Sequence, residues 1–212
     1  TSIGISMYPE DGTTVEQLIM RADKAMAYSK RNDQTGFSFY FDELKTDANR
    51  VLLLDQQLRK AIDHKEFELH YQPKVDLKTL QIIGVEALVR WKNEKLGNVS
   101  PYEFIPYAEG TGLIIPLSEI IFDKACEDYA MIASAGYGNI SIAINVSSIH
   151  FSQKNFLDSI KKILERNNTS ASHFEIEVTE RTVMNSSSET ISKLVRLKQL
   201  GFKLSIDDFG TG

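Results

Sequence analysis

The chain has 212 residues, of which 42% are hydrophobic, so it is long enough to bury a sizeable core in one large domain or two small ones. Its net charge of −5 argues against wrapping a long polyanion such as DNA, because that kind of binding neutralises many phosphates. Cys126 is the one cysteine, which excludes an internal disulfide and a zinc site built from several cysteines.

The first part of the chain predicts half of a small α+β module. Residues 1–7 alternate like a strand, and Thr13 with Glu16 forms a capping-box pattern ahead of a helix. Residues 37–41 predict an aromatic strand that can pair with residues 2–6. A module of this size folds poorly alone, so we expect that sequence upstream of Thr1 completes it.

A second helix, predicted over residues 43–64, joins this module to a longer one in which strands and helices alternate. The predicted strands are residues 67–74, 82–91, 140–146, 174–179 and 203–208, and the predicted helices are residues 101–109, 116–134, 153–166 and 188–200. Strands separated by helices imply crossover connections and a largely parallel sheet. The link between the first two strands is short enough for a hairpin, so we expect that pair to be antiparallel.

The strand at residues 82–91 places Glu86 and Arg90 inside an otherwise apolar run. Because side chains alternate across a strand, Glu86, Leu88 and Arg90 share one face, and the opposite face is apolar. An unpaired buried carboxylate is costly, so we expect Glu86 to meet a cation, a metal ion or a hydrogen-bond network. The simpler alternative is an internal salt bridge between Glu86 and Arg90.

Other strands carry polar residues in the equivalent place. Alternation puts these side chains on one shared face: Gln72, Glu86, Arg90, Asn145, Glu177 and Asp207. A barrel whose outward faces pack on helices would bring them together near the carboxyl ends of its strands, where barrel active sites lie. Three carboxylates and a carboxamide need a cation between them, and their oxygen atoms suit magnesium or manganese better than zinc. Asp208, at the start of a glycine-containing turn, is a candidate ligand of a second ion.

Two further residues are predicted to be structural. His70 alternates onto the face of Gln72 but lies deeper, so we expect a buried, hydrogen-bonded histidine rather than a ligand. Cys126 falls on a predicted helix with Phe122 and Tyr129, which predicts an inert core thiol.

Short motifs of the longer module follow one another in a fixed order. They are YQP at residues 71–73, EALVRW at 86–91, FIP at 104–106, AE at 108–109, GLI at 112–114, NVS at 145–147, EVTE at 177–180 and DDFGTG at 207–212. In order and spacing they closely resemble the EAL domain family, whose members hydrolyse cyclic di-GMP in bacteria. The resemblance covers roughly residues 51–212 and is far more specific than any one motif.

The resemblance implies an α/β fold, a partial TIM-like (β/α) barrel of the EAL type with an antiparallel first strand pair. It also implies hydrolysis of cyclic di-GMP to linear pGpG with two Mg²⁺ or Mn²⁺ ions. The implied first-ion ligands are Glu86, Asn145, Glu177 and Asp207, with Asp208 helping to hold the second ion. The implied catalytic residues are Glu86, Glu177, Asp207 and Asp208. The residues implied to contact substrate are Gln72, Leu88 and Arg90, while Glu180 would steady the loop after Asp208.

The first module resembles the end of a GGDEF domain, on SIGIS at residues 2–6, YP at 8–9, DG at 11–12, AD at 22–23 and AM at 25–26. The family's usual AMYxAK departs here to AMAYSK at residues 25–30. The implied domains are a C-terminal remnant of an α+β GGDEF domain (1–43), the start of a linker helix (44–50) and the first two-thirds of an EAL domain (51–212). A full barrel takes about 250 residues and eight strands. We therefore expect a fragment of a GGDEF–EAL protein, cut at both ends, without the family's later catalytic lysine and glutamate, and inactive alone.

The partners that the resemblance implies are cyclic di-GMP and, through a complete EAL domain, a second copy of the protein. No apolar run approaches the roughly 18 residues that span a membrane, and no signal-peptide pattern begins the chain. We therefore expect a cytoplasmic protein. A sensor or membrane domain upstream of this fragment, in the longer parent protein, is compatible with that location.

Two alternatives to the phosphodiesterase stay open. One is a sensor module that binds cyclic di-GMP without cleaving it, and the other is an unrelated barrel lyase or isomerase. The carboxylates Glu86, Glu177, Asp207 and Asp208 favour hydrolysis over the sensor. A lyase would need a lysine at a strand end, for which Lys74 is the nearest candidate.

Overall fold

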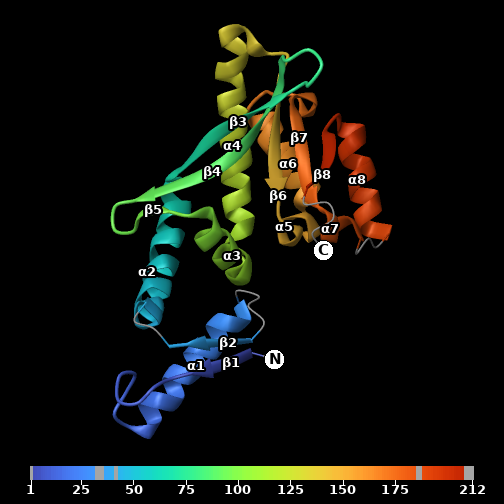
Figure 1. Cartoon of the computed structure of the whole chain (residues 1–212). Coiled ribbons are helices and arrows are strands. Elements are labelled where there is room, and N and C mark those ends of the chain that lie inside the picture. The colour runs from blue at the N-terminus through green and yellow to red at the C-terminus, as the bar shows by residue number, and fades with distance from the viewer. Residues whose placement is uncertain (1, 32–35, 41–42, 185–187, 208–212) are drawn as a thin grey trace. The chain divides into compact units, whose positions relative to one another are not determined.

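The computed structural model describes residues 2–31, 36–40, 43–184 and 188–207 (Figure 1). The chain divides into two compact units, Thr1–Gln56 and Gln57–Gly212. Helix α2, Glu43–His64, spans the division and agrees with the helix predicted over residues 43–64. Within the described ranges, no helix combines the length and the apolar character that crossing a membrane requires.

The first unit consists of two short parallel strands connected by one helix. Strand β1 (Ser2–Ile5) pairs with β2 (Gly36–Phe39), and α1 (Val15–Arg31) makes the crossover between them. The predicted pairing of the N-terminal strand with the aromatic strand is therefore confirmed.

Helix α1 lies against β1 so closely that the strand needs a glycine. A Cβ atom on Gly4 would lie 1.9 Å from the carbonyl oxygen of Ala22 in α1. The capping of α1 differs from the prediction by one residue, since the hydroxyl that accepts from the amide of Gln17, at 3.3 Å, belongs to Thr14 rather than Thr13. The helix begins at Val15, so Thr14 occupies the N-cap position, from which a hydroxyl can accept from the first turn.

The second unit is built on a mixed six-stranded sheet. Its strands are β3 (Phe67–Val75), β4 (Ile82–Asn93), β5 (Gly97–Val99), β6 (Ser141–Val146), β7 (Phe174–Thr179) and β8 (Lys203–Asp207). The sheet order is β3-β4-β6-β7-β8, with β5 paired to β4 off this path. Strands β3 and β4 are antiparallel, whereas β4, β6, β7 and β8 are parallel, as predicted.

The helices of this unit connect the parallel strands. They are α3 (Pro101–Thr111), α4 (Ile114–Ile132), α5 (Ser148–Ser152), α6 (Phe156–Arg166), α7 (Glu180–Met184) and α8 (Ser188–Leu200), with a π turn η1 (Ala133–Tyr137) and a 3₁₀ turn η2 (Ala171–His173). The helix predicted over residues 153–166 is α6, which begins only at Phe156, because Gln153 is extended (φ −60°, ψ 138°) and ends the short helix α5, which was not predicted. The three-residue strand β5 was not predicted, since so short a segment carries no alternation.

The apolar face of β4 is buried from Val85 to Trp91, as the alternation predicts, but Ile83 at its beginning is exposed. Val85, Ala87, Val89 and Trp91 are all buried, whereas Glu86, Leu88 and Arg90 on the other face are half-buried. Trp91 packs against the rings of Phe67 and Phe104, with centroids 5.8 and 5.6 Å away. The helix-covered side of the sheet is therefore the core, and the polar residues lie on the opposite side.

The two predictions for structural residues have different outcomes. Cys126 is buried, and burial raises the pKa of its thiol to about 12, so it is an inert core thiol as expected. His70 is exposed, so its predicted burial is wrong. The reason is topological: in the described part of the chain β3 is the first strand of the sheet order and pairs with a strand on one side alone, which leaves the sheet beside His70 uncovered.

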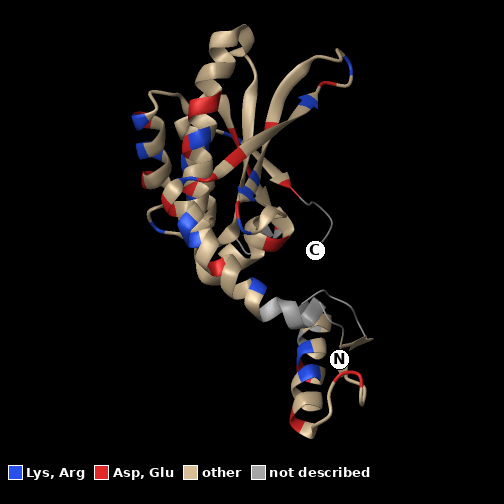
Figure 2. Cartoon of the chain, turned by 90° about the vertical axis from the view of Figure 1, so that its left-hand side faces the viewer, with Lys and Arg blue, Asp and Glu red and all other residues tan. Residues whose placement is uncertain are grey.

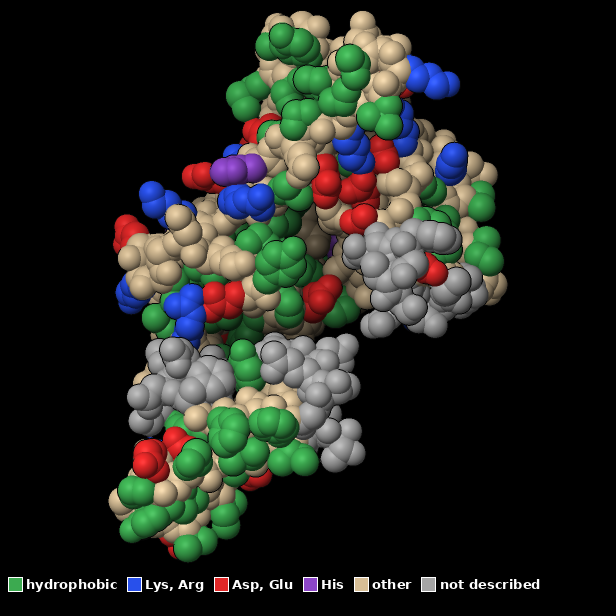
Figure 3. Space-filling view, viewed as in Figure 1, with side chains coloured by type: hydrophobic (Ala, Val, Ile, Leu, Met, Phe, Trp, Pro, Cys, Tyr) green, Lys and Arg blue, Asp and Glu red, His purple; other side chains and the backbone are tan. Residues whose placement is uncertain are grey.

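Both signs of charge are interspersed over the second unit. Lys and Arg residues lie between Asp and Glu residues along its helices in the view of Figure 2. The face shown in Figure 3 likewise has acidic and basic side chains next to one another. On the residues that are coloured by charge, neither view shows a broad basic surface.

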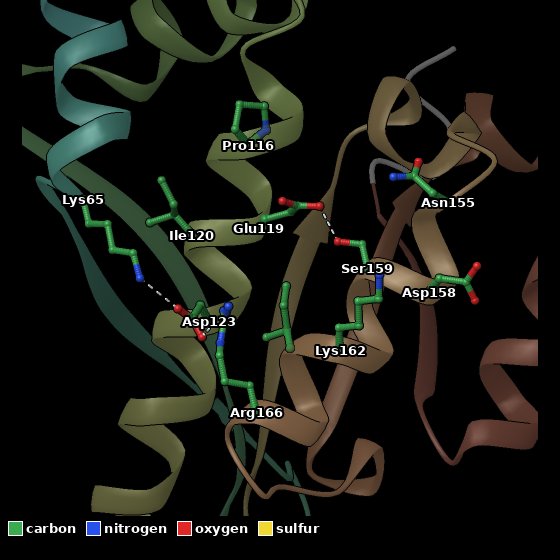
Figure 4. A pocket seen from close by; sticks show the side chains of 11 residues that line it. Lys65, Pro116, Glu119, Ile120, Asp123, Asn155, Asp158, Ser159, Lys162 and Arg166 are labelled. Carbon is green, nitrogen blue, oxygen red and sulfur yellow. Dashed lines mark hydrogen bonds and ion pairs between the residues drawn. The ribbon is translucent and has the colours of Figure 1, made fainter.

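A charged cluster joins α4 to α6 on the helical side of the second unit. Asp123 of α4 is buried, and it accepts from Lys65 Nζ at 3.1 Å, Arg166 Nη2 at 2.6 Å and Asn167 Nδ2 at 2.7 Å. Three of them border a pocket of about 460 Å³, in which Figure 4 shows Asp123 between Lys65 and Arg166. Burial alone would raise the pKa of Asp123, but the hydrogen bonds from Asn167, Arg166 and Lys65 lower it below its usual range.

We expect Asp123→Asn to lower the free energy of unfolding by about 1–3 kcal/mol near pH 7, because the amide loses charge-assisted hydrogen bonds in a buried place. The folded-state pKa lies below that of the unfolded chain. The carboxylate therefore stabilises the fold above the unfolded-state pKa of about 3.9 and loses this effect as the pH falls further. Urea unfolding followed by the fluorescence of Trp91 should show the difference between variant and wild type shrinking below about pH 4.

Asp158→Asn, on the rim of the same pocket, is the matched control, with an expected change under about 0.5 kcal/mol. Equal losses in the two variants would contradict the role given to Asp123.

Candidate functional site

The register of the strands puts the predicted site residues on one face. Gln72 is paired with Glu86 across β3 and β4, Asn145 with Glu177 across β6 and β7, and Thr179 with Asp207 across β7 and β8. Residues paired directly across neighbouring strands project to the same side of a sheet. The face opposite the helix-covered core therefore carries the carboxylates and amides.

Glu86 is held by an amide rather than by the cation on its own strand. Asn145 Nδ2 donates to Glu86 Oε1 at 2.8 Å. Arg90 Nη1 donates instead to the carbonyl of Val89 at 2.8 Å, and none of the ion pairs in the described ranges joins Glu86 to Arg90. The internal salt bridge considered from the sequence is therefore not formed.

Glu177 is the buried carboxylate of the face. Its Oε1 accepts from Lys74 Nζ at 2.5 Å and from Ser205 Oγ at 3.4 Å. Lys74 Nζ also lies 3.6 Å from Oε1 of Glu175. One ammonium group from β3 thus contacts two carboxylates of β7.

The contact between Lys74 and Glu177 shows that the sheet is strongly curved. Two strands, β4 and β6, lie between β3 and β7 in the sheet order. In a flat sheet β3 and β7 would be about 14 Å apart, and side chains stand roughly perpendicular to the sheet. The 2.5 Å contact requires the sheet to curl until the two strands face each other, which is the geometry of a partial barrel.

The charges on this face shift one another's titration. Burial raises the pKa of Glu177, Lys74 partly offsets this, and the negative charges of Glu86 and Glu175 add to the rise. For Lys74, burial alone would lower the pKa, but the hydrogen bond and charge of Glu177 outweigh it and raise the pKa. Lys74 is therefore a protonated counter-ion, which is the wrong state for the free amine that a Schiff-base lyase needs.

The other predicted residues are placed as follows. Gln72 is exposed on β3, and Asp207 is exposed at the end of β8. Glu180 begins α7, immediately after Thr179 at the end of β7. Asp208, with the loop that Glu180 was expected to steady, lies outside the described residues.

A pocket of about 260 Å³ opens beside these strands, next to α3 and α4. Leu88, Arg90, Asn145 and Glu177 line it, together with apolar side chains that include Ile105, Ile114, Leu117 and Ile121. Figure 3 shows the second unit hollowed on this face, with charged side chains gathered beside the hollow. The structure therefore brings four of the predicted residues to one pocket. The described residues that line this pocket do not include Gln72, Glu86 or Asp207.

The donor chemistry of the site fits a hard divalent cation. Glu86, Asn145, Glu177 and Asp207 all offer oxygen, which suits magnesium or manganese. Glu177 supports the fit, because a buried carboxylate that faces further negative charges is stabilised by an added cation. In the side-chain arrangement described, no three His, Cys, Asp or Glu residues lie close enough together to hold a metal ion.

Sequence reasoning missed the role of Lys74 as the counter-ion of Glu177. Alternation alone puts Lys74 on the face of Gln72, two residues along β3. The contact partner could not be found this way, because it depends on the curvature of the sheet and not on local pattern. Glu109 of α3 and Thr179 of β7 also line the pocket without having been proposed as site residues.

Comparisons with known proteins agree with this geometry. The family model described as EAL domain matches residues 55–212. Two curated relatives from Pseudomonas aeruginosa cover 100% of the chain: the bifunctional diguanylate cyclase/cyclic di-GMP phosphodiesterase MucR at 38% identity, and the cyclic di-GMP phosphodiesterase NbdA at 36%. The chain spans only 31% and 27% of the lengths of these two relatives.

Solved structures show the same fold. The PaMucR phosphodiesterase in its c-di-GMP complex superimposes with a TM-score of 0.72 at 39% identity, over 76% of this chain and 65% of that one. The second unit therefore has the α/β fold of EAL structures, a mixed sheet with helices in a partial TIM-like barrel.

Without added metal, Glu177→Gln is expected to raise the melting temperature at pH 7. The pKa of Glu177 is higher in the folded chain than in the unfolded chain, so the charged carboxylate destabilises the fold. The gain in stability of the variant over wild type is therefore absent below about pH 4 and grows as the pH rises towards the folded-state pKa. The expected rise is roughly 2–4 °C, the shift that about 1 kcal/mol produces in a domain of this size. Thermal unfolding in the presence of a chelator measures it.

Glu175→Gln is the control, because Glu175 is the more exposed of the two carboxylates at Lys74, 20% against 9% of the side chain. A melting temperature that falls in Glu177→Gln would mean that the ion pair with Lys74 outweighs the cost of burial.

Proposed function

The chain belongs to the EAL domain family, and on this basis we propose that the protein hydrolyses cyclic di-GMP to linear pGpG with Mg²⁺ or Mn²⁺. The observation that carries the proposal is the gathering of Glu86, Asn145 and Glu177 on the inner face of parallel strands, beside a pocket that also contains Arg90. Carboxylates on the inner face of such strands, beside a pocket, are the usual setting of barrel chemistry. The relatives named as cyclic di-GMP phosphodiesterases support the same reaction.

The residues that would hold the first ion are Glu86, Asn145, Glu177 and Asp207, and Asp208 would help to hold a second. When bound, divalent ions would polarise the phosphodiester and lower the pKa of a water molecule. The chain contributes the fixed oxygen donors. The amide of Asn145 orients Glu86, and Lys74 with Ser205 orients Glu177.

The substrate would be bound by Arg90, Leu88 and Gln72. Arg90 offers a planar guanidinium to a phosphate, which is the geometry that suits bidentate recognition. Leu88 and the apolar side chains of α3 and α4 line the pocket and suit the flat face of a guanine base. The pocket thus combines a cation for the phosphate with an apolar wall for the base.

The proposal extends to the division of the chain. We assign residues 1–43 to the end of a GGDEF domain, residues 44–50 to the start of a linker helix and residues 51–212 to the EAL domain. The separate compact unit at Thr1–Gln56 supports this assignment, as does the coverage of the whole chain by a relative named as a diguanylate cyclase as well as a phosphodiesterase. Pairing of two copies through the EAL domain and a cytoplasmic location remain part of the same proposal.

A sensor that binds cyclic di-GMP without cleaving it is the second candidate. The observation in its favour is that Glu86 and Glu177 are already satisfied by Asn145 and Lys74. The two candidates share the ligand and differ in the product, so one assay separates them.

The whole protein with purified cyclic di-GMP should produce pGpG in Mg²⁺ or Mn²⁺, measured by chromatography. Ca²⁺ should bind but support little turnover, because its longer and looser coordination activates water less. Binding of the dinucleotide without pGpG under either Mg²⁺ or Mn²⁺ would leave the sensor as the function.

Glu86→Gln should weaken Mn²⁺ binding and lower turnover by at least about 100-fold, since the loss of a partner behind a ligand already costs about 10–100-fold. Arg90→Ala should act mainly by raising KM, because it removes a contact to substrate and leaves the ligand set intact. Calorimetry and steady-state kinetics give the two readouts.

Glu94→Gln, an exposed change in the turn that follows β4, is the control for both variants. Equal Mn²⁺ affinity in Glu86→Gln and wild type would make Glu86 a structural residue.

A further inference from the structure

The ammonium of Lys74 and the hydroxyl of Ser205 both contact one oxygen of Glu177. The distances to Oε1 are 2.5 Å from Lys74 Nζ and 3.4 Å from Ser205 Oγ. Lys74 comes from β3 and Ser205 from β8, so the carboxylate is held from two sides of the curled sheet. In the described part of the chain, both contacts fall on Oε1, which leaves Oε2 of Glu177 for a further partner.

Lys74 reaches Glu177 from the amino end of the parallel strands. It is in register with Gly84, and Gly84 is in register with Ser141 at the amino end of β6. Asn145 lies near the carboxyl end of β6, and Asp207 ends β8. The ammonium therefore approaches the carboxylate from the amino-end side, whereas Asn145 is in register with Glu177 and Asp207 lies further towards the carboxyl ends.

We propose that Lys74 is a positioning residue for the metal site, which fixes Oε1 of Glu177 so that Oε2 is presented to a divalent ion. This inference rests on the proposed function, because it assumes that Glu177 is a ligand. Carboxylates that bind metals are commonly held by a hydrogen bond to the oxygen that does not bind, and the loss of such a partner costs about 10–100-fold in metal affinity.

The contacts of Glu177 fix the sign of the effect. Lys74 Nζ and Ser205 Oγ hold its Oε1 from two different strands. Without the ammonium, the carboxylate would lose the shorter of these contacts and would be free to turn. A lysine that merely occupied the place of the ion would have the opposite effect, since its removal would strengthen metal binding.

The test is Mn²⁺ binding to the whole protein, measured by titration calorimetry at pH 7, for wild type, Lys74→Met, Lys74→Arg and Ser205→Ala. Lys74→Met should weaken binding by about 10–100-fold. Lys74→Arg should restore much of the affinity, because arginine keeps the charge. Ser205→Ala should weaken binding less, since it removes the longer and uncharged contact. Thermal unfolding in a chelator shows whether Lys74→Met folds. If it does not fold, the Mn²⁺ affinity of Ser205→Ala tests the positioning of Glu177 in its place.

Lys203→Met is the matched control. Lys203 also projects from the sheet, and its change to Met removes the same charge. Its Nζ contacts Ser141 Oγ at 3.3 Å rather than a carboxylate. Its Mn²⁺ affinity should equal that of wild type. A similar loss in both lysine variants would reduce the effect to net charge and overturn the role of Lys74.

The outcomes separate this inference from the proposed function. If wild type binds Mn²⁺ and Lys74→Met binds it equally well or more tightly, the positioning role is wrong and the phosphodiesterase proposal stands. If wild type binds neither Mn²⁺ nor Mg²⁺, the metal-dependent function is wrong, and with it the role of Lys74 towards a metal.

Discussion

The ion pair between Lys74 and Glu177 depends on a sheet that curls until β3 and β7 face each other, and most features of the second unit follow from that curl. The outer surface of a curled sheet is covered by helices, so β4 turns Val85, Ala87 and Val89 outward into the core. The inner surface is narrow, so polar groups of β3, β7 and β8 contact one another at Glu177. The same curvature therefore creates the pocket and the electrostatic cost of the carboxylates in it.

A buried lysine, Lys193, connects α8 to the end of α5. Its Nζ donates to the carbonyls of Phe151, Ser152 and Gln153 at 3.1, 3.0 and 3.0 Å. These carbonyls are at the carboxyl end of α5, where free oxygens and the helix dipole favour a cation. Helix α5 follows Asn145 closely and α8 leads into β8, so this contact connects the segments that carry Asn145 and Asp207.

Local pattern predicted what depends on neighbours in the chain. The two-residue period of β4 gave the buried face and the face of Glu86 correctly, and the short hairpin gave the antiparallel pair. Properties that depend on distant parts of the chain were missed. The exposure of His70 follows from the place of β3 at the edge of the sheet order, and the partner of Lys74 lies 103 residues away in the sequence.

Charge balance explains why a lysine and a divalent ion can have separate roles in this interior. Lys74 is the ammonium that Glu175 and Glu177 share, and Glu86 adds a further negative charge that acts on both Lys74 and Glu177. Asn145 gives Glu86 a neutral donor, which orients the carboxylate without cancelling its charge. A second ammonium would contact few oxygens, because it has three donors on a flexible chain. A divalent cation carries two charges at one point and binds several oxygens at once, so it suits this group of carboxylates better than a second lysine would.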